Sequence, residues 1–505
     1  MDLDDWITNS NECFFINFTR PSADAPRILE EPFNPRFTYP IFGNEENIIG
    51  YKEPEIWLDF RANDGKPSLD VKFTHKFPLQ NLLPDAEQID LDNILREHLP
   101  ASAFEDGDAP ESDGPDATSA DWKPPGEQMH SFELHGKKFE IWRTRLDHVR
   151  GKEIFENLRI LVELFIEAGQ PPKDDDDEER WTLFLLYEVT PLEDSSISPY
   201  TIAGFCTCYR YWIFPTKDVL RFTKSLPSPP ASSNGDATTQ DPDEPFNNTV
   251  NLLDTPSRER ISQFVILPPY QGQSLGAKLY ESIFGYLTKL PNIFQVAVEE
   301  PSEEFDKMRD YSDIVYLRKN PVFQSLTIPT ELPPETMRKD APIPRDLILG
   351  NGVNLEDLRK EVKIVPRQFN RVLEIHLYST IPISNRNTAR ITRKEKSSNE
   401  NDRRYYFWRL ALKDRIYRQS ADILEQIEAG ERVEAIENAV VKVEEEYTER
   451  LEGLRVREKW NIGEVPVENG SSSRSKRKRA VVESDEDDWE DVEEEVAASS
   501  KKRRA

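Results

Sequence analysis

The sequence has little cysteine and little histidine. Its three cysteines, Cys13, Cys206 and Cys208, are too few for a disulfide framework, and Cys206-Thr207-Cys208 lacks the Cys-x-x-Cys spacing of zinc and redox sites. The six histidines are scattered and include no His-Glu-x-x-His pair. We therefore expect reduced structural thiols and no catalytic metal.

Long apolar runs are also missing. No run approaches the roughly 18–20 residues needed to cross a bilayer. The start, from Met1 to Trp6, has neither the basic region nor the apolar segment of a signal peptide. We expect an intracellular protein that does not enter a membrane.

Basic residues are outnumbered by acidic ones. The chain has 65 Lys and Arg against 94 Asp and Glu, which gives a formal net charge of −29. A field of that sign repels phosphate, so direct nucleic-acid binding is disfavoured and a cationic partner is favoured.

The composition changes along the 505 residues in a way that indicates an α+β protein of two or three domains. Gly430 is expected to separate two helices of the helical part. The expected order is an N-terminal α+β domain at 1–128 with a disordered insertion at about 101–128, a central domain with a mixed sheet at 129–330 and a polar insertion at about 227–248, a helical domain at 331–467, and a disordered tail at 468–505.

The central domain is expected to contain paired strands and packed helices. Trp181–Val189 and Ile202–Phe214 are apolar strands close enough in sequence to pair antiparallel. Ile261–Leu267 and Phe294–Val298 are two more strands, and a helix between them allows parallel pairing. One further helix is predicted from a single apolar stripe formed by Ile154, Leu158, Leu161, Val162 and Phe165.

The most informative segment is a strand, loop and helix from Phe264 to Leu287. Gly272 and Gly276 suit close backbone approach in the loop. Backbone N–H groups at the start of a helix are unpaired and carry the positive end of its dipole, so such a loop can hold a phosphate without basic side chains. The same pattern also occurs in purely structural loops, so its meaning depends on context.

The loop also matches another motif. Gly272-Gln273-Ser274-Leu275-Gly276 fits the Gly-x-Ser-x-Gly nucleophile elbow of α/β-hydrolases. That interpretation requires a strand that runs directly into the serine, but Pro268-Pro269 ends the strand earlier. The only histidine downstream, His376, has apolar neighbours and is expected to be structural. The hydrolase remains the weaker alternative.

An acidic pair, Glu299-Glu300, ends the strand that follows the helix. Adjacent residues on a strand point to opposite faces, so only one of the two can face a given cleft. Parallel strands bring their carboxyl ends together, so a carboxylate here is expected to face a ligand anchored by the loop. A solvated strand end is the alternative.

These segments together resemble a known family. Ser262 to Ala277 resembles the acetyl-CoA loop, Gln/Arg-x-x-Gly-x-Gly/Ala, of the GNAT superfamily of N-acetyltransferases, and in detail that of the type B histone acetyltransferase catalytic subunits. The resemblance covers about residues 1–455 without the insertions and implies a GNAT fold for the central domain. Other segments resemble the family in the same order: Phe42-Gly43-Asn44-Glu45-Glu46 with Gly50-Tyr51-Lys52, Glu179-Arg180-Trp181, Tyr209-Arg210-Tyr211-Trp212, Glu299-Glu300-Pro301 with Met308-Arg309-Asp310, and Val365-Pro366-Arg367-Gln368-Phe369.

The resemblance implies acetyl-CoA as co-substrate, no metal, and Glu299 as general base. The implied cofactor contacts are Phe264, Val265 and Ile266 along the pantetheine arm, Gln271, Gly272, Gln273, Ser274, Leu275, Gly276 and Ala277 around the pyrophosphate, and Ser302 nearby. The implied substrate groove contains Asn44, Glu46, Trp181, Tyr209, Tyr211 and Glu300, whose alternative roles are core aromatics and solvated acids. Ser274 departs from the family loop, because it stands at the position where the Gly-x-Gly motif has its first glycine.

The implied reaction is direct attack of a lysine ε-amine on the acetyl-CoA thioester. The implied substrate is the N-terminal tail of newly made histone H4, with H3 in a histone complex, and a WD-repeat histone-binding chaperone is an implied partner subunit. An acidic enzyme suits such a basic peptide.

The tail has basic clusters, Arg474–Arg479 and Lys501–Arg504, around the acidic block Glu483–Glu495. The clusters are typical of nuclear localisation signals, so we expect a protein of nucleus and cytoplasm. The acidic block could itself bind histones, which leaves a noncatalytic chaperone or scaffold as the alternative function.

We predict that deletion of residues 468–505 leaves acetylation of an H4-tail peptide nearly intact, because the tail is expected to localise the protein or hold histones. The measurement is the steady-state rate with peptide substrate, for the full chain and the truncated chain. A large loss of turnover would show that the tail takes part in catalysis.

Overall fold

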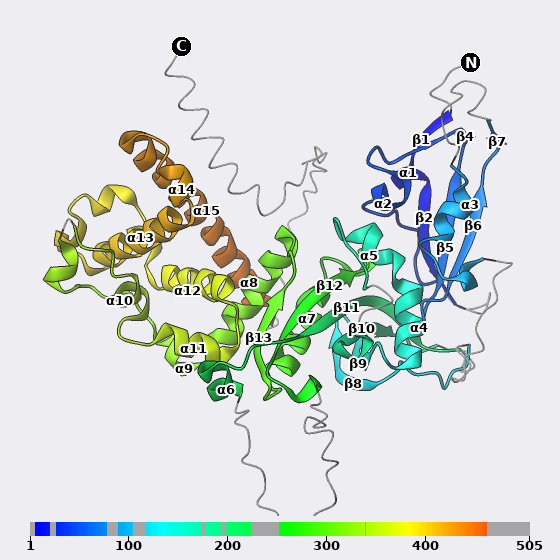
Figure 1. Cartoon of the computed structure of the whole chain (residues 1–505), viewed down its shortest axis with the longest axis horizontal. Coiled ribbons are helices and arrows are strands. Elements are labelled where there is room, and N and C mark those ends of the chain that lie inside the picture. The colour runs from blue at the N-terminus through cyan, green and yellow to red at the C-terminus, as the bar shows by residue number, and fades with distance from the viewer. Residues whose placement is uncertain are drawn as a thin grey trace, which may run out of the picture. The chain divides into compact units, whose positions relative to one another are not determined.

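The computed structural model describes residues 6–20, 27–77, 89–104, 118–172, 177–192, 197–223, 252–338 and 340–461 (Figure 1). The chain divides into two units, Met1–Glu299 and Glu300–Ala505. The described part is mixed α/β, with several sheets in the first unit and helices in the second.

The N-terminal part of the first unit is built on a three-stranded sheet in the order β2-β5-β6. β5 pairs parallel with β2 and antiparallel with β6. Ile56, Leu58 and Phe60 of β5 are buried and alternate with more exposed residues. The elements of this part are β1 (Ile7–Asn9), α1 (Ser10–Cys13), β2 (Phe14–Thr19), α2 (Tyr39–Phe42), β3 (Asn47–Ile49), β4 (Tyr51–Lys52), β5 (Glu55–Arg61), β6 (Pro67–Lys72), β7 (His75–Lys76), α3 (Leu91–Arg96) and η3 (Ala101–Ala103).

The rest of the first unit is built on a curled six-stranded sheet in the order β13-β12-β11-β10-β9-β8 (Figure 1). Its neighbours are antiparallel except β12 and β13, which are parallel. The antiparallel pairing of β10 with β11 and the parallel pairing of β12 with β13 were both predicted and are confirmed. The strands are β8 (Glu127–Leu134), β9 (Lys137–Arg145), β10 (Trp181–Val189), β11 (Tyr200–Trp212), β12 (Ser257–Ile266) and β13 (Ile293–Val298).

Helices of this unit pack on the sheet, and both α5 and α7 contact β12. The single helix expected around Ile154 and Phe165 is two helices that meet at Arg159. The N–H of Val162 donates to the carbonyl of Arg159 at 3.0 Å. A hydrogen bond to the residue three positions earlier is typical of a 3-10 turn, which is tighter than an α-helical turn. The helical elements are α4 (Val149–Leu158), α5 (Ile160–Phe165), η4 (Glu178–Arg180), α6 (Lys217–Thr223), η5 (Leu252–Asp254), η6 (Pro268–Tyr270) and α7 (Leu275–Leu287).

Parts of the expected insertion at 101–128 are ordered. Ala101–Ala103 forms a 3-10 turn, and Trp122 is buried with its ring in edge contact with Tyr187 and Tyr200. The prediction of disorder does not hold for these residues, because one large aromatic side chain finds a core site within a polar segment. Residues 105–117, the insertion at 227–248 and the tail at 468–505 lie outside the described residues.

The second unit is helical where it is described, as expected for most of its length. Gly430 does not stop a helix: it lies in the first turn of α15, and the break falls between α14 and α15. The elements are α8 (Glu303–Leu317), α9 (Pro321–Gln324), η7 (Pro334–Met337), α10 (Arg345–Gly350), α11 (Leu355–Val362), α12 (Pro366–Thr380), η8 (Ile383–Asn385), η9 (Thr388–Ile391), η10 (Lys394–Lys396), α13 (Glu400–Gln419), α14 (Ala421–Leu424) and α15 (Ala429–Asn461).

Buried carboxylates join the helices of the second unit. Glu374 of α12 is buried and accepts hydrogen bonds from Arg345, Arg415 and the hydroxyl of Tyr447. Because a buried charge is tolerated only when it is paired, these bonds fix α12 against α10, α13 and α15.

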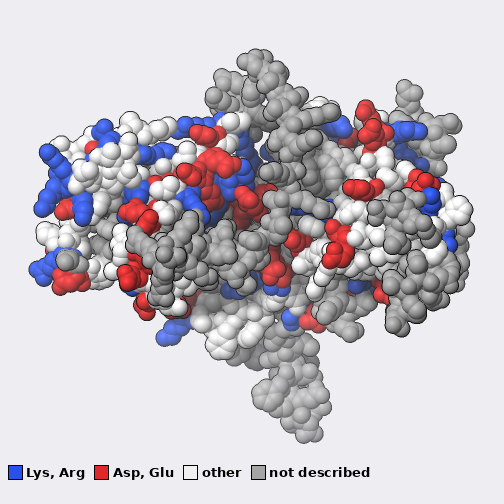
Figure 2. Space-filling model, turned by 90° about the horizontal axis from the view of Figure 1, so that it is seen from above, with Lys and Arg blue, Asp and Glu red and all other residues white. Residues whose placement is uncertain are grey.

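Figure 2 shows that acidic and basic side chains both occur among the described residues visible in that view. Within the described ranges, each helix is too short or too polar to cross a membrane.

Ser274 has a left-handed backbone, with φ 63° and ψ 9°, at the residue before α7. A residue with a Cβ atom is destabilised by about 1–2 kcal/mol in this backbone conformation. Glycine adopts it without that steric penalty. The fold therefore accounts for the glycine that the family loop has at this position, and Ser274 carries the strain.

We predict that Ser274→Gly raises the free energy of unfolding of the first unit by about 0.5–1 kcal/mol, because the strain relieved exceeds the extra entropy of an unfolded glycine. Urea unfolding measures the change. Ser274→Ala is the matched control, since it removes the hydroxyl and keeps the strain, and an equal gain in both variants would contradict the backbone explanation.

Candidate active site

β12 extends past the strand beside it. Its ladder with β13 runs from Ser257 to Ile261 and ends at the pair Ile261–Val298. β12 then continues through Ser262–Ile266, where its described strand partner is β11 on the other side. On the β13 side of this stretch, no described strand pairs with β12. Phe264, Val265 and Ile266, the predicted pantetheine contacts, lie here.

The loop after β12 is held by its own side chains. The Gln271 amide donates to the carbonyl of Ile266 at 2.8 Å, and the Gln273 amide donates to the carbonyl of Pro269 at 2.9 Å. Tyr270 is buried, and burial raises the pKa of its hydroxyl, which is hydrogen-bonded to Glu188 of β10. The loop thus has a fixed shape.

The first turn of α7 presents its backbone N–H groups beside this loop. Ser274 makes no side-chain cap, and the first turn contains no acidic residue. Gly272 has φ +72°, and a Cβ on Gly276 would lie 3.5 Å from Ile266 and 3.7 Å from Phe264. The predicted residues Gln271 to Ala277 therefore form one continuous turn at a helix N-terminus, which is suited to a phosphate or pyrophosphate.

A row of aromatic rings lies on one face of the sheet. Trp181 of β10 stands opposite Tyr209 of β11, with ring centroids 4.8 Å apart. Tyr209 and Tyr211 are 4.6 Å apart on the same strand. The buried indole N–H of Trp181 has no hydrogen-bond partner among the described residues. Three predicted substrate residues are thus brought together, with one donor unused.

The row ends at an ion pair that involves the predicted base. Arg260 of β12 stands opposite Tyr209, and its guanidinium lies 4.5 Å from the centroid of the Tyr211 ring and donates to the Tyr211 hydroxyl. Arg260 Nη2 lies 3.1 Å from Glu299 Oε1, and the Glu299 N–H donates to the carbonyl of Ile261 at 2.9 Å. The structure therefore connects the aromatic row to Glu299.

Arg260 was missed by the sequence analysis. The signal that could have found it is the register of the antiparallel pair β11–β12, which sets Arg260 opposite Tyr209. That register contains an irregularity between Thr207 and Cys208, which a count of alternating residues does not reveal.

The other predicted site residues are more scattered. Asn44 is exposed, and Glu46 Oε1 accepts the N–H of Thr38 at 2.8 Å, so Glu46 has a structural contact near α2. Glu300 and Ser302 belong to the second unit. Glu300 is exposed with φ 33°, and Ser302 caps α8 by accepting the N–H of Phe305.

His376, the histidine that the hydrolase alternative would need as its base, lies in the helical second unit. His376 is buried in α12, where its ring lies 4.7 Å from Phe323 and its Nδ1 accepts from Arg318. Burial and the Arg318 charge lower the pKa of His376 to about 4. The structural role predicted for His376 is confirmed.

Cys13, Cys206 and Cys208 are buried and free, and burial raises the pKa of the Cys208 thiol well above its usual range. The described part of the chain shows no group of three His, Cys, Asp or Glu side chains arranged to bind a metal ion.

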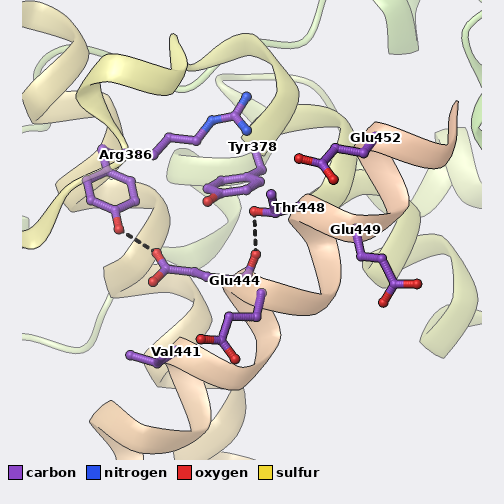
Figure 3. Close-up of a pocket in the computed structure, with 9 residues that line it drawn as sticks. Tyr378, Arg386, Val441, Glu444, Thr448, Glu449 and Glu452 are labelled. Atoms are coloured by element: carbon purple, nitrogen blue, oxygen red, sulfur yellow. Dashed lines mark hydrogen bonds between the residues drawn. The ribbon is translucent and has the colours of Figure 1, made fainter. Parts of the chain in front are cut away.

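The second unit contains a pocket of about 380 Å³ that the sequence did not predict (Figure 3). Glutamates of α15 line it together with Tyr378, Arg386 and Tyr405. The Tyr405 hydroxyl donates to Glu444, and the Arg386 guanidinium lies 4.2 Å from the Tyr378 ring centroid. None of the predicted site residues lines this pocket.

Comparisons with known proteins bear on the whole chain. Residues 6–167 match the family model described as histone acetyl transferase HAT1 N-terminus. A protein of Gibberella zeae named histone acetyltransferase type B catalytic subunit is 35% identical over 94% of this chain and 95% of its own length. A protein of the same name from Pyricularia oryzae is 34% identical over 89% of this chain and 92% of its own length. A third, from Candida albicans, is 30% identical over 94% of this chain and 95% of its own length.

Identity of this level over nearly the full length settles the assignment. The chain belongs to the family of type B histone acetyltransferase catalytic subunits and is an acetyltransferase.

Proposed function

We propose that this acetyltransferase moves the acetyl group of acetyl-CoA to lysine ε-amines in the N-terminal tail of newly made histone H4, on a central domain with the GNAT fold. The observation that carries the proposal is the divergence of β12 from β13, with the α7 turn beyond β12 and Glu299 at the end of β13. The relatives' names support a histone substrate.

Acetyl-CoA would lie along the side of β12 that has no described strand partner beyond Ile261. Phe264, Val265 and Ile266 would bond the amides of the pantetheine arm through their backbone, as a strand bonds its neighbour. The N–H groups from Gln271 to Ala277 would hold the pyrophosphate with the help of the helix dipole. Ser302 is a further proposed contact, and no metal is required.

The chemical step needs a neutral amine. A free lysine has a pKa near 10.4, about three units above physiological pH, so a retained proton would withhold about 4 kcal/mol from the attack. Glu299 accepts this proton, directly or through a water molecule. The nitrogen then forms a bond to the thioester carbon, and β12 backbone N–H groups stabilise the developing oxyanion. The C–S bond breaks, and the second proton of the nitrogen passes to the departing sulfur, so that CoA leaves as its thiol.

The peptide would approach along the aromatic row. Trp181, Tyr209 and Tyr211 offer apolar faces to the lysine stem, and the unused indole N–H of Trp181 can donate to a peptide carbonyl. Asn44, Glu46 and Glu300 would supply polar and acidic contacts to a basic tail. Histone H3 in a histone complex, a WD-repeat histone-binding chaperone, and residence in both nucleus and cytoplasm belong to the same proposal.

Glu299→Gln is predicted to lower kcat about 10²–10⁴-fold with little change in acetyl-CoA affinity, because the amide keeps the shape of the side chain and cannot take the proton. The rate of acetyl transfer to an H4-tail peptide measures kcat, and calorimetric titration measures cofactor binding. Glu304→Gln, at an exposed glutamate of α8, is the matched control. An unchanged kcat in Glu299→Gln would remove Glu299 from the role of base.

Glu46→Gln is predicted to raise KM for the H4-tail peptide by about two- to fivefold, as expected for one partly exposed charge, and to leave KM for acetyl-CoA unchanged. Glutamine still accepts the Thr38 N–H through its amide oxygen, so the fold contact is kept. Glu46→Ala, which loses this acceptor, separates the two effects because it should also lower the melting temperature. Equal changes in both KM values would count against contact with the peptide.

A further inference from the structure

Arg260 is the residue that joins the aromatic row to the carboxylate of Glu299. Its guanidinium contacts the Tyr211 ring and hydroxyl on one side and Glu299 Oε1 at 3.1 Å on the other. The two neighbouring strands, β11 and β13, thus contact one planar cation that projects from the strand between them. A guanidinium suits this place because it can stack on a ring and donate in its own plane at the same time.

Glu299 needs such a partner. β13 ends at Val298, and Glu300 has a left-handed backbone, so the chain leaves the strand directly after Glu299. The Glu299 side chain is 36% exposed. A half-exposed glutamate at a strand end samples several rotamers, whereas proton transfer needs its carboxylate within hydrogen-bond reach of the acceptor amine.

The neighbouring charged residues of β12 have other partners. Glu259, adjacent to Arg260 in sequence, is 1% exposed and pairs with Arg210 at 2.6 Å. Arg258 is exposed and donates to the side chain of Gln295 at 3.1 Å. Arg260 is therefore the arginine of β12 whose described ion pair is with Glu299.

We propose that Arg260 is a positioning residue of the transfer reaction: it holds the Glu299 carboxylate at the end of the aromatic row, where the acceptor lysine arrives. This inference rests on the proposed function. Arg260 does not take part in proton transfer itself, and its effect on the rate passes through Glu299.

The test is a double-mutant cycle on the full chain with acetyl-CoA and an H4-tail peptide. Arg260→Gln is expected to lower kcat about 10- to 100-fold, with less than about a twofold change in KM for acetyl-CoA, because a small misplacement of a catalytic group costs this much. In the Glu299→Gln background, the same substitution is expected to change kcat by less than about twofold, since the group that it positions is already inactive.

Two variants make the comparison specific. Arg260→Lys keeps the charge and loses the planar fork, so kcat is expected to fall between that of the wild type and that of Arg260→Gln. The cycle is repeated with this variant, so a folding failure in Arg260→Gln does not end the test. Arg258→Gln removes an arginine from the same strand and is expected to keep a near-wild-type kcat.

The results separate the inference from the proposed function. If Arg260→Gln lowers kcat by the same factor in the wild-type and Glu299→Gln backgrounds, or leaves kcat unchanged in the wild-type background, Arg260 does not act through Glu299 and the inference is wrong. If the wild-type chain transfers no acetyl group to the peptide while it binds acetyl-CoA, the proposed function fails, and the inference fails with it.

Discussion

The site depends on the point at which two parallel strands stop pairing. The β12–β13 ladder ends at Ile261 and Val298, and β12 alone continues to Ile266. On its β13 side this stretch of β12 has no described strand partner, and Glu299 follows directly after the end of β13. Under the proposed function, the same divergence would provide both the cofactor site and the place of the base.

Strands rather than loops fix the geometry of the aromatic row. Trp181, Tyr209 and Arg260 come from three neighbouring strands and share a face because antiparallel partners project together. The hydrogen-bonded strands of the sheet therefore hold the side chains of the row in fixed relative positions. Glu299 is the exception, since it lies just past a strand end, and its ion pair with Arg260 ties it to the sheet.

The sequence predicted what depends on local pattern. Short apolar runs predicted β10 and β11, and a helix between two strands predicted the parallel pairing of β12 with β13. It failed where the outcome depends on one residue in its tertiary setting: Trp122 is buried within a polar segment, and Gly430 is tolerated in the first turn of α15. Within the candidate site, the loop and Glu299 were predicted from sequence motifs. Arg260 became recognisable only once the irregular register between β11 and β12 was known. The left-handed backbone of Ser274 was likewise invisible, because serine gives no sign of it.

Neighbouring residues of β12 divide their charges between the two faces of the sheet. Glu259 is almost fully buried and pairs with Arg210, and burial raises the pKa of its carboxyl while the Arg210 charge opposes this. Arg260 points to the other face, where its charge meets Glu299. Because alternate residues of a strand project to opposite sides, the buried pair can stabilise the sheet without neutralising the Arg260 cation on the other face. In a chain with a net charge of −29, this arrangement leaves Arg260 at the end of the aromatic row, in an ion pair with Glu299.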